Sequence, residues 1–334
     1  MAETDRLVCL GIESTADNLG VGIATSDGTI LANVITTHVP EEGGIHPRES
    51  ARHHADVMGD TISKAFDTSQ IGSREVNVVA FSQGPGLGPC LRTGATAARA
   101  LAGYLGVPLV GVNHCVAHIE IGRLATGAVD PLTLYVSGGN TIVTGYEAGR
   151  YRVFGETLDI AVGNCLDTFA REAGLPYPGG PAVEELALGG SRLLTLPYVV
   201  KGMDLSFSGL LTAAMQELRS GRSSREDVCF SLQEVAYGML GEVTERALAH
   251  TGKGEILLTG GVAANRRLRS IVELIAEEHG VSPAFVPPSY ATDNGAMIAW
   301  TGLIAYKTGV STPISESHID SRWRLDEVEV PWRA

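Results

Sequence analysis

Apolar residues follow two periods along the chain, and the two periods alternate. Short stretches with an apolar residue at every second position are typical of β-strands, whereas spacings of three and four are typical of helices. The first predicted strands cover residues 8–12, 21–25 and 30–35, and Asp27-Gly28 marks a hairpin turn between the last two. Strands that alternate with helices in this way predict an α/β protein.

The alternation continues to residue 306. Predicted helices cover 49–66, 92–105, a segment that begins near His114, 159–173, 206–218, 225–251, 263–279 and 293–306. Predicted strands cover 76–81, 109–112, 132–136, 141–146, 151–156, 255–259 and 283–286. The strands between 132 and 156 repeat the three-strand form of the first group. We therefore expect two similar lobes with a cleft between them, where small ligands usually bind.

Composition agrees with a folded protein of two lobes. The chain has 334 residues, of which 44% are hydrophobic and 19% charged, so it is too apolar to be disordered. It contains no apolar run of about 18 residues, which predicts that no segment spans a membrane. Glu3 and Asp5 stand where a signal peptide needs positive charge, so we expect a cytoplasmic protein.

The net charge of −13 argues against a broad surface for nucleic acid. A nucleic-acid substrate would then bind on a small patch or through a partner.

Three polar turns follow predicted strands and are candidates for phosphate binding. They cover residues 13–18, 137–141 and 259–265, and the last two contain Gly-Gly pairs. Glycines let backbone N–H groups turn toward an anion, and a following helix adds its positive N-terminus. None of the three matches the P-loop or the dinucleotide-binding fingerprint. Asp167 and Glu184, in flanking helices, are candidates to accept hydrogen bonds from ribose hydroxyls.

His114 and His118 are the candidate metal ligands. They are four residues apart, so on a helix they share one face and can offer two imidazoles to one ion. Asp293, at a predicted helix start, is a candidate third ligand. A metalloprotease would need glutamate directly after the first histidine, where this chain has Cys115. The residues themselves leave open whether the two histidines bind metal or only pack.

Eight short motifs, in order from residue 11 to residue 295, resemble those of the universal tRNA threonylcarbamoyladenosine transferases. They are GIESTAD at 11–17, HPRE at 46–49, QGPG at 83–86, NHCVAH at 113–118, YVSGGNT at 135–141, YPGGP at 177–181, GGVAAN at 260–265 and DNG at 293–295. Each motif alone is weak, but the combination is highly specific. Tyr135 and the pair His46-Pro47 favour the archaeal and eukaryotic branch, whose members work in the KEOPS complex.

The resemblance implies a fold and an activity. The fold is that of the actin/hexokinase/heat-shock ATPase superfamily, with two RNase-H-like lobes and a nucleotide cleft between them. We expect the first lobe at 1–125 and the second at 126–309, with 310–334 packing back on the first. The implied reaction moves a threonylcarbamoyl group from threonylcarbamoyl-adenylate to N6 of the adenosine beside the tRNA anticodon and releases AMP.

The resemblance also implies a set of site residues and one bound metal ion per subunit. The implied metal ligands are His114, His118, Asp293 and Tyr135, and a phenolate ligand favours iron over zinc or magnesium. The residues implied to bind the adenylate or ATP are Tyr135, Val136, Ser137, Gly138, Gly139, Asp167, Gly180, Glu184 and Asn265.

The implied partners are tRNA and three KEOPS subunits, which are a small protein kinase, a dimerising subunit and a tRNA-binding subunit. Other hypotheses compete with the transferase. The chain could be an ATP-binding regulatory scaffold without catalysis, or a sugar-kinase-like phosphotransferase. Glu13 disfavours the phosphotransferase, because those enzymes usually carry aspartate at this strand end.

Overall fold

The computed structural model describes residues 6–39 and 44–333, so Glu3 and Asp5 lie outside the described residues. Two compact units make up the fold, and each is described by itself. The first unit comprises Met1–Ala125, Glu147–Tyr151 and Asp293–Ala334, and the second comprises Thr126–Tyr146 and Arg152–Thr292. Among the described residues, no helix combines the length and apolar character that crossing a membrane requires.

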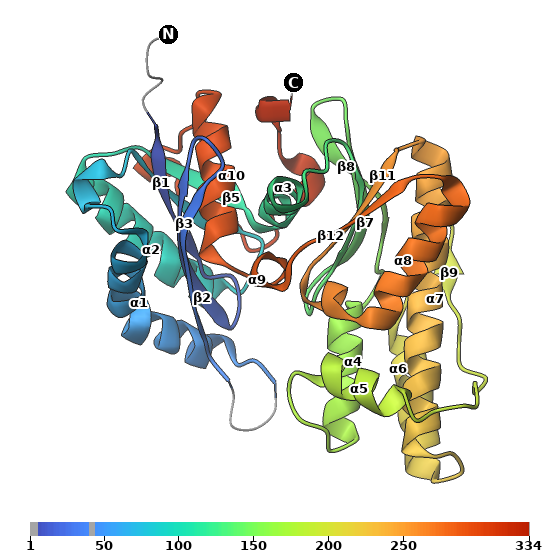
Figure 1. Ribbon diagram of the computed structural model, residues 1–334. Helices are drawn as coiled ribbons and strands as arrows, with labels where there is room; N and C mark the ends of the chain where they lie inside the picture. Colours follow the sequence, from blue (N-terminus) through green and yellow to red (C-terminus); the bar gives the residue numbers. More distant parts are fainter. Residues whose placement is uncertain (1–5, 40–43, 334) are drawn as a thin grey trace. The chain divides into compact units, whose positions relative to one another are not determined.

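The first unit is built on a five-stranded mixed sheet with the order β3-β2-β1-β4-β5 (Figure 1). Its strands are β1 (Val8–Glu13), β2 (Asn18–Thr25), β3 (Ile30–Thr37), β4 (Val78–Gly84) and β5 (Leu109–Asn113). The first three strands run antiparallel in succession, and β4 and β5 continue the sheet parallel to β1. The carboxyl ends of β1, β4 and β5 therefore lie along one edge of the sheet.

Helices cover both faces of this sheet. They are α1 (Pro47–Ser69), α2 (Gly88–Leu105), α3 (His114–Thr126) and α10 (Gly295–Lys307), with short 3₁₀ turns at Ser73–Glu75, Ile314–Glu316, Leu325–Glu327 and Pro331–Arg333. Figure 1 shows α1 and α2 on one face and α10 on the other. Leu10, Ile12, Val79 and Phe81 lie in the core between these layers and are fully buried.

Glycines bring α10 unusually close to the sheet. A Cβ added at Gly11 of β1 would lie 2.1 Å from the backbone nitrogen of Ala299, and one at Gly22 of β2 would lie 2.2 Å from that of Ala296. Only glycine leaves room for such an approach of two backbones. The close contact fixes the start of α10 over β1 and β2, and Asp293 lies two residues before this start.

The second unit repeats the strand order of the first. Its five-stranded sheet has the order β12-β11-β6-β7-β8, so a three-strand ribbon is again continued by strands parallel to its first member. The strands are β6 (Leu132–Val136), β7 (Thr141–Glu147), β8 (Arg150–Glu156), β11 (Glu255–Thr259) and β12 (Ser282–Phe285). The repeat predicted from the sequence is therefore present in the topology.

A helical layer and a large apolar core complete the second unit. Its helices are α4 (Val162–Glu172), α5 (Gly179–Ala187), α6 (Ser208–Ser220), α7 (Arg225–Thr251), α8 (Arg266–His279) and α9 (Pro288–Ala291), and a two-stranded ribbon joins β9 (Val200–Lys201) to β10 (Asp204–Leu205). Leu134, Phe169, Leu232 and Leu258 are among the fully buried core residues.

Most predicted elements are confirmed, and two helices begin three residues later than predicted. The helix predicted from 159 begins at Val162, because Asp159 turns away to accept hydrogen bonds from Phe207 and Ser208. The helix predicted from 263 begins at Arg266, because a 3₁₀ turn, η2 (Gly261–Ala264), precedes it.

One predicted boundary needs correction. We expected residues 293–309 in the second lobe, but α10 packs on β1, β2 and β4 and belongs to the first unit. The first unit therefore gains the whole segment from Asp293 onward, rather than from residue 310.

Candidate functional site

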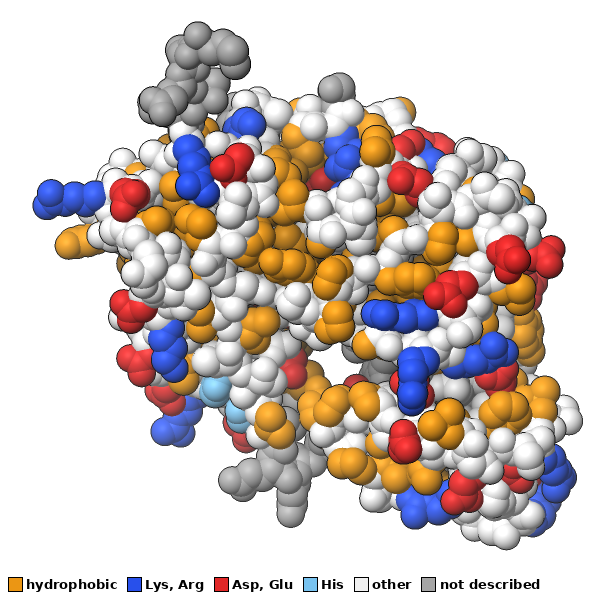
Figure 2. Space-filling view, in the orientation of Figure 1, with side chains coloured by type: hydrophobic (Ala, Val, Ile, Leu, Met, Phe, Trp, Pro, Cys, Tyr) orange, Lys and Arg blue, Asp and Glu red, His pale blue; other side chains and the backbone are white. Residues whose placement is uncertain are grey.

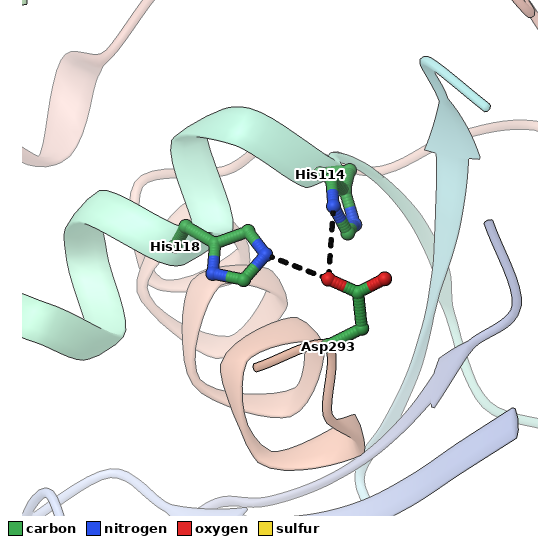
Figure 3. Close-up of side chains that lie close together, drawn as sticks. All are labelled: His114, His118 and Asp293. Atoms are coloured by element: carbon green, nitrogen blue, oxygen red, sulfur yellow. Dashed lines mark hydrogen bonds and ion pairs between the residues drawn. The ribbon is translucent and has the colours of Figure 1, made fainter. Parts of the chain in front are cut away.

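His114, His118 and Asp293 form a compact cluster in the first unit (Figure 3). His118 Nε2 lies 3.1 Å from Asp293 Oδ1, and His114 Nε2 lies 3.5 Å from the same oxygen. The two imidazole rings are 4.7 Å apart between centroids, and their planes are inclined by 81°. Two ring nitrogens thus converge on one carboxylate oxygen.

Local structure holds each of these side chains in place. His114 is the first residue of α3 and directly follows β5, and His118 is one turn further along the helix. Asn113 Oδ1 accepts hydrogen bonds from the backbone N–H groups of Cys115 and Val116, which fixes the start of α3. Asn294 caps α10 in the same way by accepting from Met297 N.

A further carboxylate, Glu13, lies behind His114. It ends β1, and its Oε2 is 3.1 Å from His114 Nδ1. The sequence analysis did not assign Glu13 to this site. The available signal was a glutamate at the end of a predicted strand, in the first of the three polar turns.

The cluster stabilises positive charge on His114 but not on His118. Burial by itself lowers the pKa of His114, but the neighbouring carboxylates of Glu13 and Asp293 outweigh burial and raise this pKa to about 9. Burial lowers the pKa of His118, against the opposing hydrogen bond to Asp293. Burial would raise the pKa of the Asp293 carboxyl, but the two histidines lower it.

These residues fit a divalent metal ion. One ligand atom from each of His114, His118 and Asp293 lies within 4.8 Å of the others, close enough to surround one ion with little movement. Two imidazoles and a carboxylate are common ligands of iron and zinc. The predicted trio is therefore brought together, within one unit, in an arrangement that can hold a metal.

The second unit gathers the residues predicted to bind the adenylate. The turn after β6 is open at Gly138 and Gly139, which are exposed and have no atom within 4 Å of an added Cβ. Ser137 Oγ accepts hydrogen bonds from the backbone N–H groups of Gly139 and Asn140, which fixes the shape of the turn.

Two other glycines press the neighbouring backbone against this turn. Gly260, with φ of 94°, approaches Val136 so closely that an added Cβ would lie 2.1 Å from the Val136 carbonyl oxygen. A Cβ added at Gly163, in the first turn of α4, would likewise lie 2.5 Å from the carbonyl oxygen of Ser137. The ends of the parallel strands β6 and β11 and the start of α4 therefore meet at Ser137.

The predicted adenosine-binding residues have structural partners of their own. Asp167 Oδ1 accepts from the backbone N–H of Gly179, and the N–H of Gly180 also bonds to this carboxyl, although burial still raises its pKa. Glu184 Oε1 accepts from the backbone and the side chain of Arg266.

Asn265 and Tyr135 are both well buried in the second unit. Asn265 caps α8 by accepting from Leu268 N, and it donates to Gln233 Oε1 at 3.0 Å. The Tyr135 hydroxyl accepts a hydrogen bond from Asn140 Nδ2 at 3.3 Å. The ligand role of Tyr135 and the adenosine-binding roles stay predictions.

Charge is distributed evenly over the visible face of the molecule. Figure 2 shows Lys and Arg side chains interspersed with Asp and Glu, without a large area of one sign. Several arginines of the second unit are paired with glutamates, as Arg267 is with Glu234 at 2.6 Å.

Comparison with solved structures supports the fold class. HypF from T. kodakarensis aligns over 91% of this chain and 48% of its own, with 15% identity and a TM-score of 0.63. The activator of the 2-hydroxyisocaproyl-CoA dehydratase from Clostridium difficile aligns over 91% of this chain and 97% of its own, with 11% identity and a TM-score of 0.54. These similarities show the fold of the actin and heat-shock ATPases and confirm the predicted fold class.

Sequence comparison gives much closer relatives. A protein of Thermofilum pendens named tRNA N6-adenosine threonylcarbamoyltransferase is 58% identical over 98% of both chains. A protein of Methanothermobacter thermautotrophicus named as a probable bifunctional tRNA threonylcarbamoyladenosine biosynthesis protein is 56% identical, and the chain spans 61% of its length.

The family model described as TsaD, tRNA N6-adenosine threonylcarbamoyltransferase, matches residues 29–300. The matched residues include His114, His118 and Asp293, the candidate metal ligands, and the turn after β6. The chain therefore belongs to the tRNA N6-adenosine threonylcarbamoyltransferase family and is a transferase of tRNA modification.

Proposed function

We propose that this chain transfers the threonylcarbamoyl group from threonylcarbamoyl-adenylate to N6 of the adenosine beside the anticodon in tRNA. The bond from N6 to the carbamoyl carbon forms, the bond from that carbon to the phosphate oxygen breaks, N6 loses one proton, and AMP leaves. The observation that carries the proposal is the converging cluster of His114, His118 and Asp293 in a member of this family.

The cluster would hold one metal ion per subunit, with Tyr135 as a further ligand. Adenine N6 is a poor nucleophile, and the ion would supply a Lewis acid that makes the carbamoyl carbon more electrophilic. Nitrogen and carboxylate ligands suit iron and zinc, and a phenolate ligand favours iron. We therefore propose iron, with zinc and magnesium as the alternatives.

The adenylate, or ATP, would bind in the second unit. The turn formed by Ser137, Gly138 and Gly139, at the end of the strand that contains Tyr135 and Val136, would hold the phosphate with its exposed backbone at Gly138 and Gly139. The residues proposed to hold the adenosine are Asp167, Gly180, Glu184 and Asn265. Support comes from their gathering around the ends of β6 and β11 and the starts of α4, α5 and α8. The carboxylates can accept hydrogen bonds from ribose hydroxyls.

The partners would be tRNA and the kinase, dimerising and tRNA-binding subunits of a KEOPS complex in the cytoplasm. Two relatives are named as bifunctional, and this chain spans about 60% of their length. The remaining part of those relatives would then supply the second activity, which supports a partner subunit for this chain. The net charge of −13 supports a role for partner subunits in holding the tRNA.

The test is transfer of labelled threonine onto tRNA in the presence of the synthase that makes the adenylate, ATP, bicarbonate and the partner subunits. We expect His114→Ala to lose at least about 100-fold of the transfer rate, since polarisation by a metal ion contributes several kcal/mol. His279→Ala is the matched control, because His279 ends α8 in an exposed pair with Glu245.

Each result separates two functions. Label that persists in His114→Ala would keep the transferase and remove the metal role of His114. No label with wild type and every partner would instead favour an ATP-binding regulatory scaffold.

A further inference from the structure

Glu13 is a fully buried carboxylate that touches the candidate metal centre without belonging to its ligands. Its side chain is 0% exposed. Oε1 accepts two hydrogen bonds from Thr15, one from the backbone N–H at 2.7 Å and one from the hydroxyl at 2.5 Å. Oε2 lies 3.1 Å from His114 Nδ1. Both carboxylate oxygens are thus engaged, and all of these residues belong to the first unit.

The contact with Oε2 decides which nitrogen of His114 keeps a hydrogen. A carboxylate only accepts hydrogen bonds, so the hydrogen between the two groups belongs to His114 Nδ1. A ring nitrogen that keeps its hydrogen has no lone pair for a metal ion. The other nitrogen, Nε2, lies 3.5 Å from Asp293 Oδ1 and is therefore the one that can bind the ion.

The same oxygen of Asp293 is 3.1 Å from His118 Nε2, so both histidines present the same type of nitrogen to the same place. Their convergence requires the His114 ring to keep its present orientation. Glu13 fixes this orientation from behind at the shorter distance, and Thr15 in turn fixes the carboxylate, with its own hydroxyl oxygen 3.3 Å from His114 Nδ1.

We propose that Glu13 is a positioning residue that keeps the hydrogen of His114 on Nδ1 and so reserves Nε2 for the metal ion. The proposal rests on the metal centre of the proposed function and adds a residue to it. Carboxylates that receive the second N–H of a metal-bound histidine orient the ring and strengthen it as a ligand.

Substitution by glutamine tests the charge and the acceptor with almost no change of shape. The Thr15 backbone N–H can only donate, so the single oxygen of a glutamine amide is expected to stay on the Thr15 side. The amide NH₂ then faces His114 Nδ1 and requires a lone pair there. The hydrogen of a neutral His114 must move to Nε2, which blocks the ligand nitrogen.

The experiment is a titration of metal-free Glu13→Gln with Co²⁺ and with Zn²⁺, compared with wild type. We expect the dissociation constant for both ions to rise roughly 10- to 100-fold, because metal affinity falls by this factor when the hydrogen-bond partner of a metal-bound histidine is removed. Glu75→Gln is the matched control. Glu75 accepts a hydrogen bond from the backbone N–H of Gly72 in an exposed turn of the same unit. The affinity of the Glu75→Gln protein for both ions should equal that of wild type.

A second measurement needs no variant of Glu13 that folds. In ¹⁵N-histidine wild type loaded with Zn²⁺, long-range ¹H–¹⁵N spectra should show His114 with its hydrogen on Nδ1 and the metal on Nε2. The His114 signals are assigned by comparison with His114→Gln.

Three results would overturn the inference. They are Glu13→Gln affinities within twofold of wild type, His114 bound through Nδ1, and a wild type that binds neither ion at this cluster. Only the third also removes the metal role from the proposed function, whereas failure of tRNA transfer by a metal-loaded wild type would leave the inference intact.

Discussion

Gly163→Ala separates the predicted phosphate-binding turn from the metal centre. Gly163 lies in the first turn of α4, and its backbone N–H donates a hydrogen bond to the carbonyl oxygen of Ser137 at 3.2 Å. An added Cβ would lie 2.5 Å from that oxygen, 2.7 Å from the Ser137 carbonyl carbon and 2.8 Å from Gly138 N. All three are backbone atoms, so no side-chain rotation relieves the clash.

The magnitude follows from these distances. An ordinary contact needs about 3.4 Å, so the turn and the helix must separate by about 1 Å. Overpacking of this kind costs about 1–3 kcal/mol, which lowers the melting temperature of a unit of this size by roughly 2–10 °C. A misplacement of about 1 Å at a binding group costs on the order of 100-fold in rate. Transfer to tRNA should fall by that factor, and ATP affinity should fall with it.

The assay combines thermal unfolding, ATP titration by calorimetry and Zn²⁺ titration. Zn²⁺ affinity should be unchanged, because the metal-ligand cluster belongs to the first unit. Gly209→Ala is the control in the second unit, since its Cβ would meet no atom within 4 Å and alanine favours a helix. Wild-type ATP affinity in Gly163→Ala would refute the assignment of this turn, and an unchanged melting temperature would refute the clash.

Three further predictions concern stability and metal. Asp159→Ala should cost about 1 kcal/mol of unfolding free energy, because Asp159 accepts hydrogen bonds at the start of α6. Desolvation would raise the pKa of Asp159, but these hydrogen bonds lower it below 3.8. The stability difference between wild type and Asp159→Ala should therefore be complete above about pH 4 and should decrease as the pH falls through the lowered pKa, as measured by unfolding at a series of acidic pH values. A chelator should lower the melting temperature of the metal-loaded wild type and leave that of His118→Ala unchanged. Bound metal stabilises the folded state by about 2.7 kcal/mol when the free metal concentration is 100 times the dissociation constant, and the chelator removes this stabilisation. Glu120→Ala should cost about 3 kcal/mol in urea unfolding and expose the C-terminal segment to proteases, because Glu120 is buried and accepts from the Trp332 indole and the Tyr151 hydroxyl.

The period of apolar residues predicted the strands and helices well, because each element buries one face against its neighbours. Asp27-Gly28 marked its hairpin correctly, and Gly28 has the positive φ of 88° that favours glycine. Helix starts were less predictable. The turn at Asp159 depends on Phe207 and Ser208, which are almost 50 residues away in sequence and give no local signal.

Long-range packing also decided what the sequence did not reveal. The assignment of α10 to the first unit follows from close contacts at Gly11 and Gly22, whose glycines were read only as parts of strands. His114 and His118 were predictable as a pair from helix geometry. The contact between His114 and Glu13 spans 101 residues, so only the folded chain reveals it.

The most direct test of the central claim supplies freshly prepared threonylcarbamoyl-adenylate, labelled in threonine, to the metal-loaded protein with tRNA and the partner subunits. No synthase is present, so the transfer step is observed alone. The account predicts label on N6 of the adenosine beside the anticodon, one AMP for each group transferred, and loss of both products in His114→Ala. Label that forms at the same rate without this protein, or AMP that forms without label in tRNA, would contradict it.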